Sequence, residues 1–152
     1  STTPGKPDDT YYVKLRAETD PALLKSGTGR LFLGFYPDPI LKAHWNNLTE
    51  PMKYVLQVRE GVTATPAEAT AAKGTGDSDS APRQFWVDIK ADKTPGDIKL
   101  KLLYYGCTPD LCAPLTHEYT IHFTPANNGS NTFGFNRGPG GGRGGKPNKQ
   151  NP

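Results

Sequence analysis

The feature that most constrains the fold of this chain is a repeated alternation of apolar and polar residues in short segments. In a β-strand, a period of two points one row of side chains into a core and the other row to water. Pro, Gly, Asp and Asn separate the segments, as they commonly do at turns. The alternation is found at 11–17, 31–35, 54–58, 85–89, 98–104 and 119–123. The pattern predicts an all-β protein.

Helix signals are weak in this sequence. The Ala- and Glu-rich stretch 67–72 is barely two turns long and is flanked by Pro66 and Gly74, so we expect no long helix. The connections 39–52 and 63–83 are too long for an evenly stranded barrel. The sequence therefore predicts an immunoglobulin-like β-sandwich with disordered termini.

The domain boundaries follow from local composition. The sandwich is predicted over 10–125, after a flexible N-terminal segment at 1–9 that is rich in Pro, Gly and Asp. The connection 63–83 is polar and low in complexity, and loops of this length are usually functional lids or mobile insertions.

The C-terminal segment 126–152 differs in composition from the rest of the chain. It holds eight of the 17 glycines, four basic residues and no acidic one. Burial of its few apolar side chains cannot offset the conformational entropy that the segment would lose on ordering. The composition therefore predicts a disordered Gly/Pro/basic tail. The remaining residues are close to neutral, so we expect no nucleic-acid partner.

No apolar run approaches the roughly 18 residues of a membrane-spanning helix. The start at Ser1 is compatible with export after removal of a leader. We therefore expect membrane contact only through a partner or a removed anchor.

The chemistry of the chain is concentrated in the segment 104–114, which joins two predicted strands. Both cysteines of the protein lie here, as Cys107 and Cys112. Their proximity predicts an intramolecular disulfide. Such a short loop gives only about 2 kcal/mol of chain-entropy stabilisation, against about 4 to 5 for a bridge between distant strands. The position therefore favours thiol-disulfide exchange, and an inert structural disulfide is the first alternative.

A copper-binding, cupredoxin-like domain is the second alternative, because Cys107, Cys112 and His117 follow at C-x4-C-x4-H spacing. The single methionine, Met52, is far from this segment, whereas cupredoxin loops usually add a methionine close by. His117 shares its period with Tyr119 and Ile121, which predicts a packed histidine. Hydrolase and phosphate-binding motifs are missing from the sequence. We expect no resident metal and no cofactor.

Two segments of the sequence are distinctive. The first reads Leu-Tyr-Tyr-Gly-Cys-Thr-Pro-Asp-Leu-Cys-Ala-Pro over 103–114 and leads into a predicted strand at 117–123. The second reads Ala-His-Trp-Asn-Asn-Leu over 43–48 and is followed by Pro51 and by Glu60-Gly61-Val62. Together they resemble the amino-terminal periplasmic domain of the thiol-disulfide interchange protein DsbD. The first is similar to the active-site hairpin of that family, and the second to a segment that precedes a strand in it.

The resemblance implies an immunoglobulin-like domain in the periplasm or another extracytoplasmic compartment. Such a domain passes electrons between a membrane-embedded redox protein and thioredoxin-like proteins. Cys112 matches the cysteine that the family uses in mixed disulfides, and Cys107 would resolve them. The residues expected to contact the partner are His44, Trp45, Tyr105, Pro109 and Pro114.

Members of the family cover the disulfide with a short loop that carries aromatic residues. The corresponding connection here, 67–82, has none. We therefore expect Trp45 to fold over the strand ends and shield the sulfurs. Tyr105 is a weaker candidate, because a period of two places it on the face opposite Tyr104.

Overall fold

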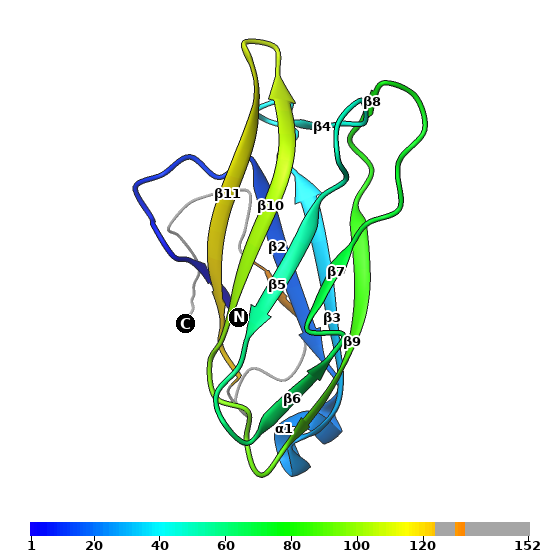
Figure 1. Cartoon of the computed structure of the whole chain (residues 1–152). Coiled ribbons are helices and arrows are strands. Elements are labelled where there is room, and N and C mark those ends of the chain that lie inside the picture. The colour runs from blue at the N-terminus through cyan, green and yellow to red at the C-terminus, as the bar shows by residue number, and fades with distance from the viewer. Residues whose placement is uncertain (124–129, 133–152) are drawn as a thin grey trace.

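The computed structural model describes residues 1–123 and 130–132, and its regular structure is almost entirely β (Figure 1). The elements, in chain order, are β1 (Thr2–Pro4), β2 (Val13–Thr19), α1 (Pro21–Ser26), β3 (Thr28–Pro37), β4 (His44–Asn46), β5 (Lys53–Gln57), β6 (Val62–Thr65), β7 (Glu68–Thr70), β8 (Ser78–Asp79), β9 (Arg83–Ala91), β10 (Ile98–Thr108), β11 (Leu111–Ile121) and β12 (Ser130–Thr132). The six alternating segments of the sequence correspond to β2, β3, β5, β9, β10 and β11.

The strands form two antiparallel sheets. One sheet has the order β12-β2-β3-β9-β6. The other has the order β1-β11-β10-β4-β8, with β5 also pairing with β10 and β7 with β5. The sets β2-β3-β9-β6 and β11-β10-β5 have the strand orders of the two sheets in an immunoglobulin-type sandwich. The predicted all-β sandwich is confirmed.

The core lies between the two sheets. Along β2, β3, β10 and β11, alternate side chains are buried, as the period of two requires. The largest fully buried side chains include Phe35, Tyr54, Leu100, Leu102 and Tyr119. Phe35 stacks on Tyr54 with ring centroids 6.2 Å apart, which joins one sheet to the other.

The N-terminal segment differs from the sequence prediction. Residues 1–9 were expected to be flexible, but Thr2–Pro4 pair as β1 with Tyr119–Ile121 of β11. The Thr2 side chain is buried, and its Oγ1 donates to the Leu15 carbonyl at 3.0 Å. The main-chain groups at this end of β11 thereby gain partners that composition alone does not reveal.

The short helix α1 was not predicted, although its end signals stand in the sequence. Asp20 accepts a hydrogen bond from the Ala22 N–H at 3.2 Å, and Pro21 begins the helix. Gly27 ends it at φ 83°, the left-handed conformation that glycine adopts most easily. The expectation of no long helix holds for the residues that the structure describes, and none of their helices is long and apolar enough to cross a membrane.

Two further segments contain strands that were not predicted: the connection 63–83, expected to be a lid or a mobile insertion, and the segment 126–152, expected to be disordered. The connection 63–83 contains the end of β6 and all of β7 and β8, which pair with strands of both sheets. Within 126–152, Ser130–Thr132 form β12 and pair with β2. The other residues of that predicted tail lie outside the described residues.

Candidate functional site

The two cysteines lie at the end of the long hairpin formed by β10 and β11. The register is unbroken from Ile98 opposite Ile121 to Thr108 opposite Leu111. Pro109 and Asp110 make the turn, and the Asp110 N–H donates to the Thr108 Oγ1 at 3.3 Å. Proline suits a turn because its φ is already fixed near the value required. The hairpin tip projects beyond the body of the sandwich in Figure 1.

This register places Cys107 directly opposite Cys112, and the predicted disulfide is confirmed. The two Cα atoms are 4.0 Å apart. The two residues differ in exposure, because Cys107 is buried with 7% of its surface accessible and Cys112 is exposed. An external thiolate therefore has easier access to Cys112.

A third strand, β4, places one more residue in line with the two cysteines. In the pairing of β4 with β10, His44 lies opposite Cys107 and Trp45 lies opposite Gly106. Residues directly opposite each other share one face of a sheet, so His44, Cys107 and Cys112 form one row on the outer face. The half-buried His44 ring is 3.1 Å from the Lys42 carbonyl through Nδ1. Since a carbonyl only accepts, Nδ1 is the donor in this hydrogen bond.

Two other predicted partner residues lie on the same face as the cysteine row. Tyr105 is opposite Pro114, and both are exposed. The neighbouring Tyr104 is buried, so Tyr105 and Tyr104 point to opposite faces, as the sequence predicted. Pro109 lies in the turn beside the row. The structure thus brings His44, Tyr105, Pro109 and Pro114 close to the disulfide.

Trp45 does not have the position expected of a cover over the sulfurs. It is buried in the core cluster on the inner face, with its ring edge-on to Tyr104 at a centroid distance of 5.6 Å. Its indole N–H donates to the Ala81 carbonyl at 2.7 Å. The alternation along β4 explains the difference, because a residue next to the outward His44 must point inward.

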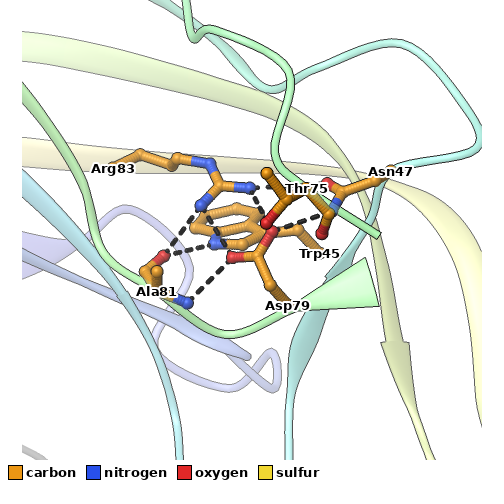
Figure 2. Close-up of polar contacts among 6 residues, drawn as sticks. All are labelled: Trp45, Asn47, Thr75, Asp79, Ala81 and Arg83. Carbon is orange, nitrogen blue, oxygen red and sulfur yellow. Dashed lines mark hydrogen bonds and ion pairs between the residues drawn. The ribbon is translucent and has the colours of Figure 1, made fainter. Parts of the chain in front are cut away.

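A polar cluster fastens the segment that precedes β9 to the strand that carries His44 (Figure 2). The Arg83 guanidinium donates to both carboxylate oxygens of Asp79, Nη1 to Oδ1 at 2.8 Å and Nη2 to Oδ2 at 3.0 Å. The Asn47 amide donates to the Asp79 Oδ2 at 2.8 Å and to the Thr75 carbonyl at 3.2 Å. We call this arrangement the Asp79–Arg83 latch. Hydrogen bonds from Arg83 hold the pKa of Asp79 well below its usual range.

The latch also contacts the core. The Arg83 guanidinium carbon lies 5.1 Å from the centre of the Trp45 ring, a favourable cation–π arrangement. β8 pairs with β4, and β4 in turn pairs with β10 beside Cys107. The connection 63–83 is therefore a support for the strand next to the disulfide, whereas the sequence predicted a lid or a mobile insertion.

The geometry argues against a copper site formed by Cys107, Cys112 and His117. His117 points inward from β11, where its Nε2 is 3.1 Å from the Tyr104 hydroxyl and its ring stacks on Tyr11 at 4.5 Å. The cysteines occupy the outer face, so the three side chains do not converge. The packed histidine predicted from the period of two is confirmed. Burial lowers the pKa of His117.

Sequence reasoning missed the latch, because its members are separated by up to 36 positions and lie in a polar, glycine-containing segment. The only local signal was an Asp and an Arg four residues apart.

No protein-family model, no curated protein and no solved structure matches this chain.

Proposed function

We propose that this chain is an extracytoplasmic thiol-disulfide exchange domain that passes reducing equivalents through Cys107 and Cys112. The partners are thioredoxin-like or membrane-embedded redox proteins. The observation that carries the proposal is the unequal burial of the two sulfur-bearing residues, buried Cys107 and exposed Cys112, at the tip of a projecting hairpin. The resemblance of 103–114 to the DsbD amino-terminal domain supports the same function.

The exchange proceeds in two balanced steps. A partner thiolate attacks Sγ of Cys112, a mixed disulfide forms, and the Cys107–Cys112 bond breaks to release the Cys107 thiolate, which then takes up a proton. A second partner thiolate attacks the partner sulfur of the mixed disulfide and releases the Cys112 thiolate. The partner leaves oxidised, with two electrons transferred to this domain. The reverse sequence lets the reduced domain reduce another protein.

A purely structural disulfide would add little stability at this position. β10 and β11 are already joined by a continuous register of cross-strand pairs and a tight turn. Closing so short a loop adds about 2 kcal/mol at most in the chain-entropy model. A disulfide between the two sheets would restrict the unfolded chain far more.

Trapping and potentiometry test the function. The Cys107→Ser variant leaves Cys112 free to be caught in a mixed disulfide with a thioredoxin-fold protein whose active-site disulfide is intact. The Cys112→Ser variant is the matched control, and we expect it to trap poorly because Cys107 is buried. A reduction potential well above about −300 mV supports exchange, whereas a value below it marks a resistant structural bridge and overturns the proposal.

A further inference from the structure

The outer edge of β11 is only partly covered by another strand. β1 pairs with β11 at Tyr119–Ile121, and the Gly5 N–H donates to the Glu118 carbonyl at 2.8 Å. In the part of the chain that the structure describes, no strand pairs with this side of β11 over 112–116. Figure 1 shows the upper part of β11 as the outermost strand of its sheet.

The hydrogen bonds at the covered end fix which main-chain groups face outward. Ser1 and His122 exchange two main-chain bonds, from the Ser1 amino group at 3.1 Å and from the His122 N–H at 2.7 Å. The Glu118 carbonyl also faces this edge. In an antiparallel ladder, outward-facing residues alternate along the strand. Because the register with β10 is unbroken, Cys112, Pro114 and Thr116 also direct their main-chain groups outward.

The uncovered edge thus presents a defined set of groups. Cys112 and Thr116 each offer an N–H and a carbonyl, whereas Pro114 offers a carbonyl alone. Proline within sheets is found where its missing N–H would face away from the ladder, as on an edge strand. Pro114 therefore leaves the β10–β11 ladder intact and limits indiscriminate strand pairing at the edge.

We propose that the redox partner lays an extended segment next to its reactive cysteine along Cys112–Thr116, as an added strand. This inference rests on the proposed function. β1 shows that the same edge accepts a strand, and the added segment would continue its line toward the hairpin tip. Strand addition gains affinity from main-chain hydrogen bonds, and neighbouring side chains supply selectivity. Here the exposed Tyr105 and Pro114 lie beside the attacked sulfur.

Amide hydrogen exchange tests the pairing directly. The probe is the peptide acetyl-Val-Thr-Val-Thr-Cys-amide, joined by a mixed disulfide to Cys112 of the Cys107→Ser variant. Paired antiparallel with its cysteine opposite Cys112, it directs the main-chain groups of its valines toward Pro114 and Thr116. The control is the same peptide with N-methyl groups on its valines. We expect the Cys112 and Thr116 amides to exchange about tenfold more slowly with the first peptide than with the second. Equal exchange with both peptides overturns the proposal.

Reduction rates of the native disulfide give a second test. Thr116→Pro removes one outward N–H, and Thr116→Val keeps it. We expect Thr116→Pro to slow reduction by the peptide severalfold and to leave reduction by 2-mercaptoethanol unchanged, while Thr116→Val changes neither. Pro114→Ala adds an outward N–H and should accelerate the peptide reaction alone. Parallel changes with both thiols overturn strand addition. Resistance of the disulfide to both thiols in every variant overturns the proposed function instead.

Discussion

Arg83 binds Asp79 through two parallel hydrogen bonds, at 2.8 and 3.0 Å. The side chains retain only 13% and 22% of their accessible surface. A two-point guanidinium–carboxylate pair of this kind is stronger and more directional than an ordinary exposed ion pair. The latch is therefore expected to stabilise β8, β4 and, through them, the strand beside Cys107.

Replacing Asp79 by Asn should lower the free energy of unfolding at pH 7 by about 1 to 2 kcal/mol. The pKa of Asp79 is lower in the folded protein than in the unfolded chain. Its contribution is therefore complete above the unfolded pKa and is lost as pH falls toward the folded pKa. In urea titrations, the difference between wild type and Asp79→Asn should be constant above about pH 5 and shrink below about pH 4.

Asp92→Asn provides the matched control, because Asp92 pairs with Arg59 at 2.9 Å on an exposed surface. We expect a smaller loss for that variant. Equal losses in the two variants would contradict a special contribution from the latch.

Gly106 is required by the close approach of Tyr104. A Cβ at Gly106 would lie 2.5 Å from Cε2 of the Tyr104 ring, which is itself held between Trp45 and His117. Gly106→Ala should therefore lower the free energy of unfolding by about 1 to 3 kcal/mol. In a double-mutant cycle measured by urea unfolding, the alanine should cost much less when Tyr104 is already Leu. An equal cost in both backgrounds would place the strain elsewhere.

Six strands of this domain were predictable, namely β2, β3, β5, β9, β10 and β11. Each buries one face, and burial of one face produces a period of two in the sequence. The disulfide between Cys107 and Cys112 was also predictable, because a hairpin turn can place residues five apart directly opposite each other. The period of two also predicted the inward side chain of His117.

Features that depend on distant residues were not predictable. β1 is polar and contains Pro4, so only its pairing with β11 reveals it as a strand. Trp45 was assigned to a loop, but its pairing with Gly106 makes it part of a strand with an inward face. The latch joins Asn47 to Asp79 and Arg83 across the fold, and no local pattern records such a contact.

His117 should make stability pH-dependent near neutrality. Burial lowers its pKa in the folded protein, while the nearby Asp9 and Lys14 act in opposite directions. The unfolded chain then binds more protons below the usual histidine pKa, so stability is complete above that pKa and falls as pH drops toward the folded value. Urea titrations between about pH 7.5 and 5.5 should show a smaller loss for His117→Gln than for wild type. His122→Gln, at a half-buried histidine, serves as control, and coincident profiles for wild type and His117→Gln would contradict the prediction.

The last prediction concerns which sulfur an external thiol attacks. His44 flanks Cys107 on one side and Cys112 flanks it on the other, so a small thiol should react mainly at the exposed Cys112. His44→Ala removes one flank, and the share of mixed disulfide at Cys107 should rise severalfold. The check is acid quenching during reduction by 2-mercaptoethanol, alkylation of the released thiol, and mass-spectrometric mapping of each cysteine. His44→Gln, which keeps most of the bulk, should retain the wild-type distribution. If the alanine variant also retains it, the burial of Cys107 comes from its own strand and not from β4.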